Sequence, residues 1–178
     1  MGETSGEGRD ASPRGVFWYH PGMNAIRNRR ALKALMLALA VAAAGCSSAP
    51  AGQGQAVHVV LTSTCMCCKG WVAHMRDNGF TVTTEEVGGD VLGDLKREHN
   101  IGPPLAACHT ATVEGYVVEG HVPADAVARL LAERPDIAGI AVPGMPAGSP
   151  GMESPNPEPY RILAFDENGQ MTGVFDRR

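Results

Sequence analysis

The apolar positions along the middle of the chain predict a strand and a helix in succession, twice over. Residues 56–62 (AVHVVLT) form a short segment that is rich in β-branched side chains, which is typical of a buried strand. A helix capped within residues 63–64 is expected next, with cysteines in its first turn and Gly79 just past its end. Residues 80–87 then alternate as a second strand, and residues 91–99 form a short second helix. The first half of the domain therefore has the order β-α-β-α.

The second half predicts two strands, a helix, an irregular stretch and a hairpin. The strands are expected over residues 105–113 and 115–120, and the helix over residues 123–135. Residues 139–159 contain six prolines, which preclude a long regular element. Residues 160–175 contain the pair Asn168-Gly169 where a turn is expected, which is typical of a β-hairpin. No internal repeat is evident.

This order of elements, with a CxxC from Cys65 to Cys68 where the first strand meets the first helix, resembles the thioredoxin fold. The resemblance implies an α/β (α+β) domain with a central mixed sheet and flanking helices, extended by the Pro/Gly-rich loop and the C-terminal hairpin. It also implies that Pro104 takes the place of the cis-proline that faces the CxxC in that fold. Cys108, on the strand that follows, would then approach the cysteine cluster.

The chain before the domain is typical of an exported lipoprotein. A basic stretch from Met23 leads into eleven apolar residues, 34–44, too few for a membrane span of about 20 residues. Residues 43–46 (AAGC) resemble a lipobox, so we expect residues 23–45 to be a signal peptide and Cys46 to be lipidated. Since such a signal begins close to its start, we expect Met23 to be the initiator and residues 1–22 to be a superfluous extension.

Two other interpretations of this segment stay open. One is secretory cleavage near Ala49, which would discard Cys46, and the other is a twin-arginine signal at Arg29-Arg30. After cleavage, residues 46–55 would form a flexible tether to a domain spanning residues 56–178. We therefore expect a periplasmic protein that is anchored by lipid to the outer membrane.

Composition and charge narrow the possible partners. The chain of 178 residues is 44% hydrophobic and 19% charged, which suits one globular domain. Residues 1–45 carry a net charge of +3, so the remaining 133 residues carry −7. An acidic domain repels phosphate backbones, so we do not expect nucleic acid as a partner.

Four cysteines remain once Cys46 is set aside, and three of them crowd into four residues. A helix N-terminus favours the thiolate, which is the metal-binding and nucleophilic form. Soft thiolates suit Cu(I), whereas a structural zinc site usually draws on two cysteine knuckles, of which one is missing here. The four are Cys65, Cys67, Cys68 and Cys108, and the thioredoxin resemblance implies that Cys108 approaches the other three. Two alternatives stay open: a redox-active dithiol, and a structural disulfide from Cys65 or Cys68 to Cys108.

Three strings together resemble the family of small exported metal-binding proteins that includes the copper-resistance protein CopG. They are CCKGWVAHMRDNGFTV, CHTATVEGYVVEGHVPADAVARLLAERP and GIAVPGMPAGSPGME, in the family's order within residues 57–153. The resemblance implies a thioredoxin-like fold, Cu(I) in a cysteine-bridged cluster that can be polynuclear, and a role in copper tolerance. It carries Cys65, Cys67, Cys68 and Cys108 over as ligands, while Met66 stands where the family's triplet has Gly.

For the five histidines of the domain we favour roles other than metal binding, although ligation by His109, His74 or His121 stays an open alternative. His109 should point to the opposite face of its strand from Cys108. His74 lies about 10 Å along the helix axis from the cysteines, so a packing role is favoured. His121 is expected to bond a turn, and His58 and His99 to lie on a strand and at the surface.

The thioethers of Met145 and Met152 are further candidate ligands, although loop methionines also pack loosely over a core. Trp71, one helical turn after the cysteines, is expected to keep water off the cluster. No glycine pattern of a phosphate-binding loop is present, because no Gly-Lys-Ser/Thr follows the loop glycines.

The sequence therefore favours an exported protein that holds Cu(I) in a thiolate cluster for buffering, transfer or copper redox cycling. Its partners would be copper ions and other periplasmic copper-handling proteins. The main alternative is a periplasmic thiol-disulfide oxidoreductase using Cys65 and Cys68, which leaves open whether the protein is an enzyme. A zinc-stabilised interaction module is a further alternative.

Overall fold

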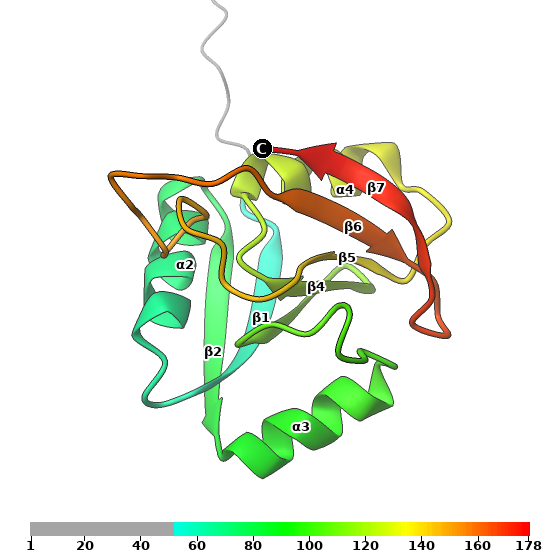
Figure 1. Cartoon of the computed structure of the whole chain (residues 1–178), viewed down its shortest axis with the longest axis horizontal. Helices are drawn as coiled ribbons and strands as arrows, with labels where there is room; N and C mark the ends of the chain where they lie inside the picture. Colours follow the sequence, from blue (N-terminus) through cyan, green and yellow to red (C-terminus); the bar gives the residue numbers. More distant parts are fainter. Residues whose placement is uncertain (1–51) are drawn as a thin grey trace, which may run out of the picture. The chain divides into compact units, whose positions relative to one another are not determined.

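A seven-stranded mixed sheet forms the centre of residues 52–178, the part of the chain that the computed structural model describes (Figure 1). The predicted extension 1–22, the signal peptide 23–45, Cys46 and the start of the tether lie outside the described residues. The elements in chain order are β1 (Ala56–Thr62), α2 (Met66–Asp77), β2 (Thr81–Val87), α3 (Gly89–Glu98), β3 (Thr110–Val113), β4 (Tyr116–Gly120), α4 (Ala124–Glu133), β5 (Gly139–Val142), β6 (Arg161–Phe165) and β7 (Met171–Arg177).

The connections explain the strand directions. The strands lie in the order β2-β1-β3-β4-β5-β6-β7. The pairs β1-β2 and β4-β5 are parallel, and each is joined through a helix, α2 or α4, as a parallel pair requires. The other neighbours are antiparallel. The mixed sheet with flanking helices confirms the predicted α/β fold class.

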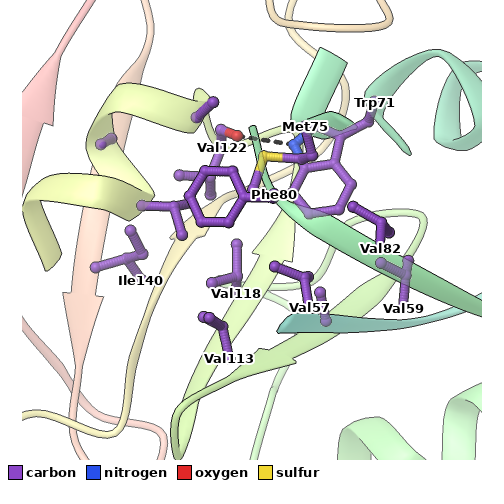
Figure 2. Packing of buried hydrophobic residues seen from close by; sticks show 14 of the residues in the cluster. Val57, Val59, Trp71, Met75, Phe80, Val82, Val113, Val118, Val122 and Ile140 are labelled. Carbon is purple, nitrogen blue, oxygen red and sulfur yellow. Dashed lines mark hydrogen bonds between the residues drawn. The ribbon is translucent and has the colours of Figure 1, made fainter. Parts of the chain in front are cut away.

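Helices α2 and α4 cover one face of the sheet. Figure 2 shows Trp71 and Met75 of α2 packed above Val57, Val59, Val113 and Val118 of the sheet. The Trp71 indole N–H donates to the carbonyl of Val122 at 2.7 Å, so the helix is tied to the segment that leads into α4. This apolar layer lies directly behind the N-terminal end of α2, which carries three of the four cysteines.

Helix α3 lies on the other face. Lys96 of α3 donates to Thr110 and Glu119, whose strand neighbours Ala111 and Val118 point toward the first layer. A second apolar cluster on this face joins Ile101 and Leu105, which follow α3, to side chains of β4, β5 and β6. Among the described residues, no helix is both long enough and apolar enough to cross a membrane.

The helix ends follow the local signals with one correction. Gly79 has φ +88°, its N–H donates to the carbonyl of Arg76, and the N–H of Phe80 donates to Met75, which is a Schellman ending. At the start of α2, however, the N-cap is Cys65 rather than residues 63–64. The end of the predicted tether also bonds to the domain, because Gly52 N–H donates to the carbonyl of Asn78.

Two predictions about the second half need correction, and one strand was not predicted. The strand predicted over 105–113 begins only at Thr110, because the segment before it turns at Gly102, whose carbonyl accepts two N–H groups. Pro104 is exposed in that turn, and Cys108 is the residue that faces the CxxC. The buried strand β5 was not predicted, because four residues beside a proline-rich loop carry no periodic signal.

Candidate metal centre

The four cysteines predicted as ligands meet at one end of the sheet. Cys65 is the N-cap of α2, Cys67 and Cys68 lie in its first turn, and Cys108 comes from the loop before β3. All four sulfur atoms lie within 4.8 Å of one another. The Cys67 sulfur is 3.5 Å from that of Cys65 and 3.9 Å from that of Cys108. Residues 41 positions apart in sequence are thus brought into one cluster.

Two of the four sulfurs are joined. A disulfide links Cys65 to Cys68, while Cys67 and Cys108 are free and partly buried. The bond closes the CxxC, so the predicted alternative of a bridge to Cys108 is wrong. In this oxidised form two thiols face the site, and reduction of the disulfide would supply the other two.

Cys108 is held in its protonated form by its surroundings. Burial, followed by the neighbouring Cys67, raises the pKa of its thiol to about 12. His121 lies beside it, with Nε2 2.9 Å from the sulfur and Nδ1 2.8 Å from the carbonyl oxygen of Pro150. Because a carbonyl can only accept, Nδ1 must carry the hydrogen, which leaves the Nε2 lone pair to accept the thiol proton.

His109 also faces this site, contrary to the expectation from strand alternation. Its side chain is fully buried, with Nδ1 3.6 Å from the Cys108 sulfur and the ring 4.6 Å from that of Trp71. Alternation does place His109 with Ala111 on the α2 face. Cys108 lies before the strand begins and can therefore turn to the same face.

The imidazole of His109 is neutral and only partly bonded. Burial, with smaller contributions from His121 and Lys96, lowers its pKa to about 3. Within residues 52–178 its Nε2 has no hydrogen-bond partner. Atoms of Cys108, His109 and His121 lie within 4.8 Å of one another, so they form a second group of donors beside the cysteines.

One family model matches part of the chain, and two solved structures resemble most of it. A family model described as a protein of unknown function, DUF411, matches residues 105–152. No curated protein matches the chain. Two solved structures, described as copper resistance protein copG in form 2 and form 1, are 38% and 36% identical to it. In each comparison the TM-score is 0.64, and the match covers 70% of this chain and 98% of the other.

The chain belongs to the CopG family. Its likeness extends over nearly the whole length of both CopG structures and includes the same fold. Together with a cysteine cluster able to bind a metal, membership of the CopG family supports a copper-related function. The predicted family resemblance is therefore confirmed.

One methionine of the proline-rich loop, Met145, contacts the cluster. The Met145 sulfur is 3.9 Å from the Cys67 sulfur, and the side chain is 53% exposed. It thus lies at the mouth of the site. Met152 closes a loop turn through its backbone, donating to Ser149 and accepting from Gly148.

His74 and Trp71 have the packing roles expected of them. His74 Nε2 accepts the N–H of Ala124 at 3.0 Å, which couples α2 to the first turn of α4. Trp71 is fully buried in the core, and its ring packs against that of His109, whose Nδ1 lies 3.6 Å from the Cys108 sulfur. His58 is exposed at β1, where it contacts Glu85 at 3.2 Å, and His99 is the C-cap residue of α3.

Sequence reasoning missed the buried ion pair behind the cluster. Glu119 of β4 is fully buried, and Lys96 of α3 bonds its carboxylate. The available signal was an acidic residue inside an apolar strand, YVVEG. A buried carboxylate requires partners, so that signal pointed to a nearby cation.

Proposed function

We propose that the reduced chain binds Cu(I) through the thiolates of Cys65, Cys67, Cys68 and Cys108 and serves copper tolerance. The convergence of four sulfurs within 4.8 Å carries the proposal. Soft thiolates prefer Cu(I) among the first-row metals, and a thiolate can bridge two ions. A set of sulfurs this close therefore suits a sulfur-bridged cluster with more than one copper ion.

The groups around the sulfurs fit such a cluster. Three of the four cysteines lie at the N-terminal end of α2, which carries the positive end of the helix dipole. Trp71 and His109 exclude water on the inner side. Met145 at the mouth and the Nε2 lone pair of His121 are additional donors that suit copper, and we include both as candidate ligands.

The proposal places this site outside the cytoplasm. Residues 23–45 have the basic stretch and the apolar run of a signal peptide. Cys46 would carry the lipid that holds the domain at the outer membrane. From there the protein would buffer copper, transfer it or cycle its redox state. Labelling with a fatty-acid analogue should mark the chain and fail to mark the Cys46→Ala variant, and labelling of both would remove the anchor from the proposal.

Anaerobic titration with Cu(I) tests the binding itself. The full chain with Cys46→Ser, fully reduced, should bind copper tightly enough to compete with a chromophoric Cu(I) chelator. The same chain with the four cluster cysteines also changed to Ser should lose this binding. Retention of the same stoichiometry and affinity in that variant would contradict the proposal.

The disulfide favours a second candidate function, thiol-disulfide exchange. Cys65 and Cys68 form a CxxC at a helix N-terminus and are already bonded to each other. In exchange, their dithiol would reduce a substrate disulfide to two thiols while the Cys65–Cys68 bond forms. Rapid reduction of insulin without copper by the reduced chain would favour this function, and its absence would leave copper binding.

A further inference from the structure

A fully buried carboxylate lies behind the cysteine cluster, on the opposite face of the sheet from α2. Glu119 accepts the N–H of Ala107 at 2.6 Å through Oε1 and the hydroxyl of Thr110 at 2.7 Å through Oε2. The Lys96 ammonium group bonds Glu119 and also donates to the Thr110 hydroxyl at 2.9 Å. Every polar atom of this network has a partner from within it.

The two residues bonded by the carboxylate flank Cys108 and His109. Ala107 comes directly before Cys108, and Thr110 begins β3 directly after His109. Between them, the carbonyl of His109 accepts the N–H of Gly120 at 3.0 Å. One side chain of β4 thus fixes both ends of the short segment that delivers Cys108 to the site.

The segment held by Glu119 is also bonded to the loop at the mouth of the site. Ala107 forms a parallel bridge with Gly144, and Gly144 N–H donates to the carbonyl of Ala106 at 3.0 Å. The next residue is Met145, whose sulfur contacts that of Cys67. A shift of Ala107 would therefore move two of the groups that surround Cys67.

Fold stability alone does not explain this buried ion pair. Burying two charges costs desolvation energy, and apolar residues of similar volume commonly stabilise a fold as well or better. What apolar residues cannot supply is an acceptor for the Ala107 N–H, which hydrogen-bonds Glu119 beside Cys108.

We propose that Glu119, neutralised by Lys96, is a positioning residue that fixes the backbone on both sides of Cys108 and so holds its sulfur within reach of Cys67. The consequence for copper affinity rests on the proposed function. Groups that orient ligands in this way typically change metal affinity by about 10- to 100-fold when removed.

Two double variants separate the hydrogen bond from the charge. Lys96→Met with Glu119→Gln leaves the network uncharged but keeps an amide oxygen for Ala107. Lys96→Met with Glu119→Leu is equally uncharged and has no acceptor. The first variant should hold Cu(I) within about threefold of the parent affinity, and the second should bind at least about tenfold more weakly.

A copper-free measurement keeps this test apart from the proposed function. In a chain with Cys46, Cys65 and Cys68 changed to Ser, oxidised glutathione can form a Cys67–Cys108 disulfide and release two glutathione thiols. The equilibrium constant reports how well the two sulfurs, 3.9 Å apart, are held together. The Gln variant should keep this constant and the Leu variant should lower it at least tenfold, whether or not the chain binds copper.

The control variant and the fallback variant each change a residue of the hairpin formed by β3 and β4. Glu114→Gln with Arg134→Met breaks an exposed ion pair at its far end and should change neither quantity. If the Leu variant fails to unfold cooperatively, Thr110→Val removes one arm of the network and should still lower the disulfide constant severalfold. Equal values for the Gln and Leu variants, or no effect of Thr110→Val in that fallback, would overturn the proposal.

Discussion

At the scale of single residues, the site depends on side chains that keep one protonation state. Cys108 keeps its proton in the copper-free protein because burial and Cys67 raise its pKa to about 12. His121 is oriented by the carbonyl of Pro150, and burial lowers its pKa. Binding a metal at Cys108 must therefore release a proton, so copper affinity should rise with pH.

His74 makes the stability of the fold depend on pH. Burial lowers its pKa, an effect that outweighs the opposing attraction of Asp125, Glu153 and Asp77. The neutral ring accepts the Ala124 N–H, and a protonated ring cannot. The unfolded chain therefore takes up a proton near pH 6.5 while the folded chain does not. Stability contributed by neutral His74 is complete above that pH and is lost as the pH falls toward its lower folded pKa.

His74→Gln should remove part of this pH dependence, because an amide oxygen accepts the same N–H without titrating. Urea unfolding of the copper-free chain between pH 7 and pH 5 measures it. The loss of unfolding free energy over this range should be smaller in the variant than in the parent. Equal losses in the two proteins would show that His74 does not bear the coupling.

At the scale of elements, the end of β4 fixes the segment that carries Cys108. Gly120 has φ +73°, and a Cβ there would lie 2.6 Å from the carbonyl oxygen of Val142 and would overlap Ala107. Glycine is thus required both by the backbone conformation and by the close approach of two neighbouring segments.

Gly120→Ala should destabilise the fold by about 3 kcal/mol, because overpacking adds to the left-handed strain. Gly115→Ala is a matched control: this glycine also has positive φ, +91°, but open space around it. It should cost only about 1 kcal/mol. Urea midpoints at constant slope measure both, and equal costs would contradict the steric argument.

The elements whose boundaries are set by short local patterns were predicted correctly. The strand β1, the glycine ending of α2 and the hairpin with Gly169 in its turn follow from short patterns, and the structure confirms them. The strand β5 and the late start of β3 depend on pairing with distant segments, which no local pattern encodes. The same limit applies to the order of strands in the sheet.

The part of the site formed by residues close together in sequence could be predicted. The cysteine triplet is visible in the sequence, and the family resemblance added Cys108. The orientation of His109 and the bonding of Glu119 were not predictable, because both depend on which face of the sheet a helix covers. The packing of α2 against one face and α3 against the other supplies that information.

At the scale of the whole molecule, disulfide formation and copper binding compete for the same sulfurs. The Cys65–Cys68 bond leaves only Cys67 and Cys108 as free thiols in the cluster. Any copper that needs all four sulfurs must then favour the reduced protein. By linkage, copper should protect the dithiol from oxidation to the same degree.

The oxidised chain should therefore bind fewer copper ions, and bind them at least about tenfold more weakly, than the reduced chain. Cys65→Ser with Cys68→Ser should behave like the oxidised form, since both lack the same two thiolates. Copper stoichiometry with thiol counting on each protein measures this. Full binding by the oxidised chain would remove Cys65 and Cys68 from the ligand set.

X-ray absorption at the copper edge tests the central claim most directly. The reduced full chain with Cys46→Ser, loaded anaerobically with Cu(I), should show a first shell dominated by sulfur and additional scattering from neighbouring copper ions. Changing the four cluster cysteines to Ser should abolish both signals. A first shell of nitrogen and oxygen, or the same sulfur shell in the Ser variant, would contradict a copper cluster held by Cys65, Cys67, Cys68 and Cys108.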